Sequence, residues 1–179
     1  TRQRFHRCAG VERYAWTMPT LPLAAFDQAW PLHDAQSSRR IETAAAARLP
    51  PHALMQRAGL SVARLALAIA PHAQRIWIAA GPGNNGGDGL EAAMHLRRAD
   101  KQVLVSLAGD PSKMPADAAA SLRRATDAGV TIGEATAAPA DVDLAIDALL
   151  GLGATREPEG ALAELVRAIN ASACPRLAA

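Results

Sequence analysis

The chain has few aromatic residues, little net charge and only two cysteines, and each shortage excludes a class of protein. Phe, Trp and Tyr make up 3% of the 179 residues although half of the chain is hydrophobic, so a core must be built from Ala, Leu, Ile and Val. The net charge of +2, without a basic patch interleaved with aromatic residues, is too small to indicate nucleic-acid binding. Charged residues interrupt every long apolar stretch, so no segment is expected to span a membrane.

The two cysteines and five histidines do not suggest a metal centre. Cys8 and Cys174 lack metal-ligand spacing, and two free thiols in a reducing, cytoplasmic compartment are the simpler interpretation. The histidines are scattered along the chain. His95 follows Asp88 by seven residues and shares its side of a predicted helix, but packing is a simpler role for it than catalysis.

Residues 1–31 are predicted to form a tail that is extended or disordered. The first twenty residues carry four arginines and one acidic residue, with neither helical periodicity nor the apolar stretch of a secretory signal. Residues 32–179 are long enough to form one domain with its own core.

Helical and strand patterns alternate along this domain. Helices are expected over 34–48, 52–70, 90–99, 114–128 and 160–171, and strands over 75–80, 103–107, 130–132, 143–149 and, as the opening of a fifth, 176–179. This alternation predicts an α/β fold, a Rossmann-like three-layer α/β/α arrangement whose mainly parallel sheet is preceded by two N-terminal helices. In such sheets ligands bind beyond the carboxyl ends of the strands.

The most informative segment follows the first strand. It reads Gly81-Pro82-Gly83-Asn84-Asn85-Gly86-Gly87-Asp88-Gly89, and a helix is expected to begin directly after it, at Leu90. Gly81, Gly83 and Gly86 fit the G-x-G-x-x-G pattern of dinucleotide-binding loops. The glycines are expected to allow backbone conformations that are closed to other residues. The free N–H groups and positive dipole of the helix N-terminus would then bind a negative or polar ligand.

The polar residues of this segment narrow the choice of ligand. Asn84, Asn85 and Asp88 add oxygen atoms that a plain pyrophosphate loop would not carry. Because a carboxylate is an awkward neighbour for a phosphate, Asp88 favours hydroxyl groups, an amide or a cation. A simpler role for Asp88 is to cap its helix, which would not exclude ligand binding. Asp147 ends the fourth strand at the same edge of the sheet. There it either binds a ligand in the crevice or accepts hydrogen bonds from nearby backbone amides.

Three segments together resemble the NAD(P)H-hydrate epimerases, the YjeF N-terminal domain family. Besides the nine-residue loop, residues 34–42 and 54–59 are similar to the two N-terminal helices of that family, and Asp147–Gly153 is similar to its second loop. The resemblance covers about residues 32 to 179. It implies an isomerase of nicotinamide nucleotide repair, which interconverts the R and S forms of hydrated NADH and NADPH so that a dehydratase, fused or separate, can act on the S form.

The resemblance also implies roles for individual residues. Contacts to the hydrated nucleotide would come from Asn84, Asn85, Gly86, Gly87 and Asp88, and the loop formed by Gly151, Leu152, Gly153, Ala154, Thr155, Arg156 and Glu157 would wrap the phosphates with its backbone amides. Arg156 is either an additional phosphate ligand or a solvated surface residue. One potassium ion per subunit, held by Asn85 and Asp147, and a homodimer are implied in the same way.

No catalytic residue is assigned within the chain. The resemblance places the acid/base aspartate, and a serine near the potassium ion, in a V-D-x-P-S-G segment beyond Ala179. Two alternatives therefore stay open. One is a nucleotide-sensing or partner-binding module without turnover. The other is an ordinary NAD(P)-binding oxidoreductase domain, in which Asp110 would hold the ribose; Asn84, Asn85 and Asp88 weigh against it.

Overall fold

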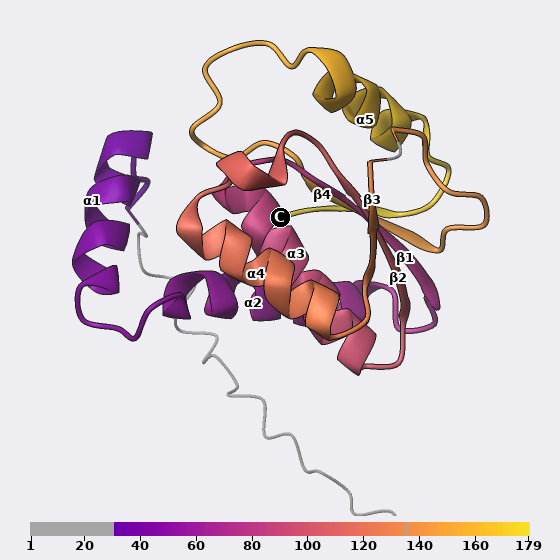
Figure 1. Cartoon of the computed structure of the whole chain (residues 1–179), viewed down its shortest axis with the longest axis horizontal. Helices are drawn as coiled ribbons and strands as arrows, with labels where there is room; N and C mark the ends of the chain where they lie inside the picture. The colour runs from indigo at the N-terminus through magenta and orange to yellow at the C-terminus, as the bar shows by residue number, and fades with distance from the viewer. Residues whose placement is uncertain (1–30, 135) are drawn as a thin grey trace, which may run out of the picture. The chain divides into compact units, whose positions relative to one another are not determined.

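Five parallel strands form one sheet in the computed structural model, which describes residues 31–134 and 136–179 (Figure 1). The strands are β1 (Arg75–Ala80), β2 (Gln102–Leu107), β3 (Thr131–Gly133), β4 (Leu144–Ala148) and β5 (Arg176–Ala178), in the order β3-β2-β1-β4-β5. Every neighbouring pair is parallel. The predicted α/β class is confirmed, and each strand lies within a residue of its expected bounds.

Helices cover both faces of the sheet. They are α1 (Ala35–Ala46), α2 (Ala53–Ile69), α3 (Asn84–Arg98), α4 (Ala116–Asp127) and α5 (Gly160–Ala171), with a short 3-10 turn, η2 (Pro111–Lys113). Alternate residues of β1 point to opposite faces: Ile76 and Ile78 pack in one cluster with α2, α3 and α4, whereas Trp77 packs with α5. Figure 1 shows α5 on the opposite side of the sheet from α3 and α4.

Both cores are built largely from small and aliphatic side chains, as the composition predicts. Trp77 is the only Phe, Trp or Tyr residue between His33 and Ala179, and it is completely buried. Its indole Nε1 donates a hydrogen bond to the hydroxyl of Ser106 on β2, at 3.0 Å. Its polar atom is therefore satisfied inside the apolar layer beneath α5.

Helix α3 begins at Asn84, six residues before the start predicted from the sequence. The expectation of a glycine-rich loop extending to Gly89 is therefore wrong: only Gly81, Pro82 and Gly83 separate β1 from α3. Glycine is a poor helix former, so local propensity argued against a helix here. Tertiary packing overrides that preference, because glycines 86, 87 and 89 of α3 are all buried.

These glycines are needed for space and not for unusual backbone angles. Among the described residues, glycines with positive φ are 109, 129 and 160, none of which belongs to this segment, so that expectation is also wrong. A Cβ on Gly81 would overlap the carbonyl oxygen of Leu149, and a Cβ on Gly86 would overlap that of Gly81. The end of β1, the start of α3 and the end of β4 are thus in direct backbone contact.

The same close packing continues along α3. A Cβ on Gly87 would lie 2.6 Å from the Met55 sulfur of α2 and 2.9 Å from Cα of Ala118 on α4. On the sheet side, a Cβ on Gly89 would lie 2.5 Å from that of Ala148. Helix α3 is therefore enclosed by two helices and the sheet, and its N-terminus is held rigidly at the end of β1.

Several expectations concern the rest of the chain. The described residues from His33 to Ala179 form one compact unit. The tail predicted over 1–31, like Cys8, lies outside the described residues apart from residue 31. Cys174 is a free thiol. In the part of the chain that is described, every helix is too short or too polar to cross a membrane.

Candidate functional site

A cleft of about 780 Å³ opens at the carboxyl edge of the sheet, beyond the adjacent strands β1 and β4. In the order β3-β2-β1-β4-β5, the chain turns in opposite directions from these two strands, and such a switch point is the usual ligand site of open α/β sheets. The volume is that of a small-molecule site. The cleft is lined by Ala35, Ser38, Arg39, Glu42, Thr43, Pro82, Gly83, Asn84, Asn85, Asp88, Leu149, Leu150, Gly151, Leu152, Gly153, Ala154 and Leu162.

The N-terminus of α3 forms one wall of the cleft. Its N-cap residue is Gly83, which has no side chain to bond the first N–H groups of the helix. The first hydrogen bond of the helix is donated by the N–H of Gly87 to the carbonyl of Gly83, at 3.1 Å. The N–H groups of Asn84, Asn85 and Gly86 lie before it, at the positive end of the helix dipole, and can bind a ligand.

Asn85 connects this wall to the loop after β4. Its Nδ2 donates a hydrogen bond to the carbonyl of Leu150, at 3.2 Å. Its Cβ lies 3.3 Å from where a Cβ on Gly151 would stand, so the two segments touch. The loop then folds back on itself, since the N–H of Ala154 donates to the carbonyl of Gly151 at 3.0 Å. The two segments singled out by the sequence are therefore adjacent walls of one site.

Asp88 lies on the cleft wall and is half-buried. It is the fifth residue of α3, whose cap is Gly83, so the expectation that Asp88 caps the helix is wrong. Burial, and then the charges of Glu42 and Glu91, raise the pKa of Asp88 to about 6. A carboxyl with such a pKa can donate or accept a hydrogen bond near neutral pH, which suits a ligand with hydroxyl groups.

We expect Asp88→Asn to stabilise the protein at pH 8 and to leave its stability nearly unchanged at pH 4. The folded pKa of about 6 lies above the ordinary value of 3.8, so the folded state binds the extra proton between these values. Wild-type stability therefore falls as the pH rises through this window. Because the carboxyl is partly exposed, we expect a gain of only about 1 kcal/mol at pH 8. Urea unfolding of both proteins at the two pH values measures it; an equal difference at both would contradict the raised pKa.

Asp147 ends β4 close to the cleft but does not line it. Its Oδ1 accepts a hydrogen bond from the N–H of Leu149, at 3.0 Å, which is the simpler of the two roles predicted for it. The two potassium ligands that the resemblance implies offer oxygen atoms, which are the type of ligand that a hard cation prefers. Asn85 directs its amide nitrogen to Leu150, which leaves its Oδ1 as an acceptor, and Asp147 keeps a second carboxylate oxygen.

Other cation ligands would have to be backbone carbonyls, waters or oxygens of the ligand. Among the described residues there is no group of three or more His, Cys, Asp or Glu side chains that could hold a metal ion. An amide and a single carboxylate suit a weakly charged ion better than a transition metal, which prefers imidazole or thiolate ligands.

Not every residue expected at the site faces the cleft. Gly86 and Gly87 are packed inside the domain, although Gly86 still presents its N–H at the helix start. Thr155, Arg156 and Glu157 are exposed and line a smaller hollow of about 330 Å³ next to the cleft. Arg156 makes no ion pair within the described part of the chain.

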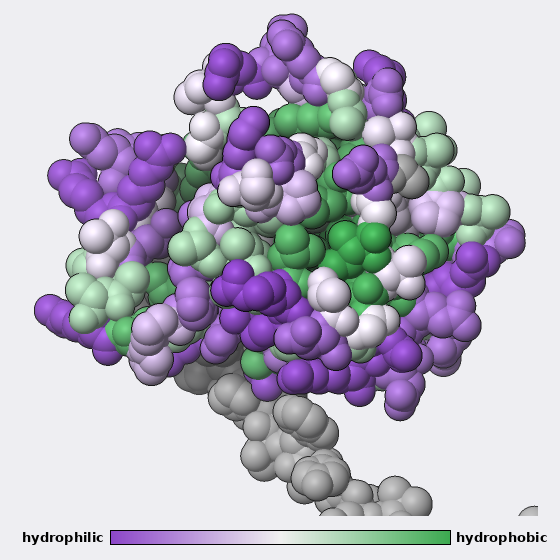
Figure 2. All heavy atoms as spheres, in the orientation of Figure 1, coloured by the Kyte–Doolittle hydropathy of each residue, from purple (hydrophilic) through white to green (hydrophobic). Residues whose placement is uncertain are grey.

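Helix α1 forms a wall that the sequence did not identify as part of the site. Its residues Ser38, Arg39, Glu42 and Thr43 line the cleft opposite the loop after β4. Figure 2 shows hydrophilic residues on part of α1 and of the loop that precedes α5, although Ile41 and Leu152 of these segments are exposed apolar residues. The spacing of 38, 39 and 42 places these side chains on one side of a helix, which was the only available signal. The sequence could not show what that side faces.

A buried polar cluster below the cleft was also missed. Glu91 of α3 is 1% exposed, and its Oε2 accepts hydrogen bonds from Ser121 (3.0 Å) and from Nη2 (2.7 Å) and Nε (2.9 Å) of Arg124 on α4. His95 is partly buried with its Nε2 3.9 Å from Oε1 of Glu91, and burial lowers its pKa. His95 does not line the cleft, which agrees with a packing role.

Asp110 does not lie where it could hold the ribose of a dinucleotide, as an oxidoreductase domain would require. Its carboxylate caps the turn η2, accepting hydrogen bonds from the backbone N–H and the hydroxyl of Ser112 at 2.9 and 2.7 Å, and it pairs with Lys113 at 3.6 Å. The Ser112 bonds lower the pKa of Asp110. Because the carboxylate is engaged there and does not line the cleft, the feature that favoured an oxidoreductase is lost.

The strand order, the glycine-rich junction of β1 with α3 and the cleft at the switch point define a Rossmann-like ligand-binding domain. The comparison with known families is more specific. The chain belongs to the family described as YjeF-related protein N-terminus, whose family model matches residues 51–179.

Similar proteins share this domain within chains of different lengths. An NAD(P)H-hydrate epimerase of Pirellula staleyi is 37% identical over 158 residues, which are 82% of this chain and 69% of that protein. One of Bordetella pertussis strain Tohama I is 40% identical over 131 residues, covering 70% of this chain and 55% of that protein. A bifunctional NAD(P)H-hydrate repair enzyme of Hyperthermus butylicus is 36% identical over 132 residues, but only 25% of its length is covered.

The fold is shared with a solved structure. The crystal structure of the yeast protein ynu0 superposes with a TM-score of 0.70 at 20% sequence identity, covering 83% of this chain and 69% of that one. This likeness supports the α/β architecture described above.

Proposed function

We propose that this chain interconverts the R and S epimers of hydrated NADH and NADPH, so that a dehydratase can restore the working cofactor. One arrangement supports the proposal above all. The start of α3 and the loop after β4 form adjacent walls of a cleft at the switch point, in a chain whose relatives are named NAD(P)H-hydrate epimerases. The reaction is an isomerisation that needs no redox partner.

The cleft would bind the hydrated nucleotide through groups already described. Asn84, Asn85 and Asp88 would contact its polar groups, and the backbone amides of the exposed loop Gly151–Glu157 would bind its phosphates. In the proposed arrangement the free N–H groups of α3 lie next to that loop and add to its attraction for an anion.

Epimerisation takes place at a carbon that carries both the ring nitrogen and a hydroxyl group. The hydroxyl leaves as water with one added proton while the nitrogen lone pair stabilises the cation; water then returns to either face and releases a proton. A carboxyl group can give and take that proton. Asp88, with a pKa of about 6, can hydrogen-bond the hydroxyl in either protonation state. We name no residue for the proton transfer itself.

A potassium ion held by Asn85 and Asp147 is part of the proposal. A large monovalent cation is a weak Lewis acid, so its contribution would be to order the start of α3, the end of β4 and the bound substrate. A homodimer, a cytoplasmic location and cooperation with a dehydratase are proposed on the family resemblance. For the dehydratase, the bifunctional repair enzymes of Hyperthermus butylicus and Leishmania braziliensis provide support.

The test is the rate of epimer interconversion. The purified protein is mixed with one epimer of hydrated NADPH, and R and S are separated by chromatography over time, in potassium and in tetramethylammonium buffer. We expect faster mixing than without protein, and more so in potassium. Binding without faster mixing would favour a nucleotide-sensing module, and hydride transfer with a reduced cofactor would favour an oxidoreductase.

We expect Asn85→Ala to slow interconversion about 10-fold, the equivalent of 1.4 kcal/mol, and to remove most of the potassium dependence. The substitution deletes both the amide oxygen and the hydrogen bond to Leu150. Asn170→Ala is the matched control, because Asn170 is an exposed residue of α5 that does not line the cleft. If Asn85→Ala kept the full potassium dependence, Asn85 would not be an ion ligand.

A further inference from the structure

The loop after β4 is held between two side chains from different helices. At Gly151 it touches Asn85 of α3, as described above. At Gly153 it faces α1: a Cβ on Gly153 would lie 3.2 Å from Nη2 of Arg39, and apart from Gly153 and its two chain neighbours no other described heavy atom lies within 4 Å of that point. The guanidinium group of Arg39 therefore reaches across the cleft from α1 to the backbone of this loop.

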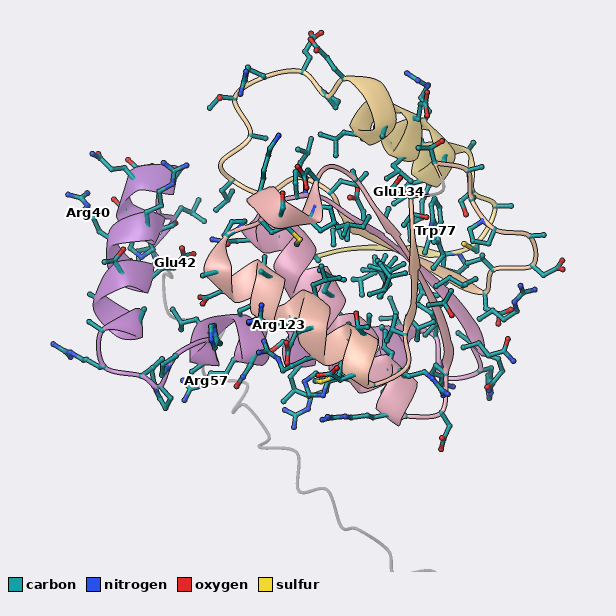
Figure 3. All side chains as sticks on the ribbon, viewed as in Figure 1. Arg40, Glu42, Arg57, Trp77, Arg123 and Glu134 are labelled. Atoms are coloured by element: carbon teal, nitrogen blue, oxygen red, sulfur yellow. The ribbon has the colours of Figure 1, made fainter. Side chains whose placement is uncertain are left out.

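The charge of Arg39 is available to a ligand. Arg39 forms no ion pair in the described part of the chain, although Glu42 lies three residues further along α1 and lines the same cleft. Its neighbour Arg40, by contrast, donates to the hydroxyl of Ser37 at 3.1 Å and does not line the cleft. Figure 3 shows Arg40 on the side of α1 that faces away from the sheet and Glu42 on the side that faces it.

The distribution of charge around the cleft favours one place for an anion. Glu42 and Asp88 both line the cleft and disfavour a phosphate beside them. The backbone N–H groups at the start of α3, the exposed loop from Gly151 to Ala154 and Arg39 favour it. Arg39 meets this loop at Gly153, and the loop meets the start of α3 two residues earlier, at Gly151, so the three attractive groups lie along one short stretch of backbone.

We propose that Arg39 binds a phosphate of the nucleotide diphosphate against the Gly151–Ala154 loop, so that α1 contributes directly to ligand binding. This inference rests on the proposed function, since it takes the ligand to be a dinucleotide. A guanidinium group offers paired N–H donors that match phosphate oxygens, and lysine would retain the charge but lose the paired geometry.

The experiment compares Arg39→Ala, Arg39→Lys and the control Arg40→Ala by calorimetric titration with two probes. ADP-ribose carries the diphosphate, and adenosine carries none. We expect Arg39→Ala to weaken ADP-ribose binding about 10- to 100-fold and Arg39→Lys to weaken it less, because a hydrogen bond to a charged group is lost or impaired. Adenosine binding should be unchanged, and Arg40→Ala should bind both probes like the wild type.

Each outcome decides between the two proposals. If Arg39→Ala weakened the binding of both probes equally, Arg39 would act on the shape of the site. If it left ADP-ribose binding unchanged, Arg39 would not contact the phosphate. Either outcome overturns the inference and leaves the epimerase proposal intact. If the wild type shows no phosphate-dependent affinity at all, the inference also fails. If Arg39→Ala selectively loses ADP-ribose affinity while the wild type does not interconvert epimers, the phosphate contact stands and the proposed reaction is wrong.

Discussion

Gly86→Ala is expected to destabilise the protein by about 4 kcal/mol or more, at the upper end of single-substitution effects. Helix rules alone predict the opposite sign, because alanine is favoured over glycine inside a helix by about 1 kcal/mol. Packing decides the outcome: the added Cβ would overlap the carbonyl oxygen of Gly81 and lie 2.7 Å from the carbonyl carbon. Both atoms belong to backbone that cannot move aside, so α3 would have to shift from the end of β1.

The control comes from the same segment. A Cβ on Gly83 meets no heavy atom within 4 Å, and Gly83 is the N-cap of α3, where serine is a preferred residue. Gly83→Ser should therefore leave stability unchanged or raise it slightly. Chemical denaturation of the two variants and the wild type measures the difference. Equal stability of Gly86→Ala and wild type would mean that β1, α3 and β4 are not packed as closely as described.

The contrast between Gly83 and Gly86 shows which features of this segment could be predicted from the sequence and which could not. The G-x-G-x-x-G spacing correctly predicted that this segment joins a strand to a helix, because such a junction is a local pattern. The reason for each glycine was not local. At Gly86 the reason is the backbone of β1, and at Gly87 it is the pair of helices α2 and α4. The early start of α3 was missed for the same cause, since propensity does not include burial.

The strands were predicted to within a residue because buried parallel strands are short apolar runs that end at polar or glycine residues. The walls of the cleft were predicted only in part. Asn84, Asn85 and Asp88 were identified because they stand within the motif, whereas Arg39 and Glu42 belong to a polar side of α1 without one. Helical periodicity shows that such a side exists, but its partner depends on the tertiary fold.

Glu91→Ala is expected to cost about 3 kcal/mol, the lower end of the range for breaking a buried ion pair. Glu91 and Arg124 are 33 residues apart and belong to different helices, so no local pattern could predict their pairing. Removal of the carboxylate leaves the fully buried hydroxyl of Ser121 without its acceptor and removes the charged partner of Arg124, whose Nη2 keeps only its hydrogen bond to the Ser121 oxygen, at 3.0 Å. The expected cost stays at the lower end because the Arg124 side chain is 27% exposed and can turn partly to water.

Two further variants separate the ion pair from other causes. Glu91→Leu combined with Arg124→Leu removes both charges and should recover much of the loss, because an apolar replacement of a whole buried pair is often neutral. Arg123→Ala, at an exposed position next to Arg124, should change stability by less than about 0.5 kcal/mol.

Glu91 is also one of the charges that raise the pKa of Asp88. Glu91→Gln should therefore lower the pKa of Asp88. A pH titration of the Asp88 carboxyl group by carbon-13 NMR measures this change. If the Glu91–Arg124 pair only joined α3 to α4, the titration of Asp88 would not change. A lower pKa would show that the buried cluster affects the protonation of Asp88 in the cleft.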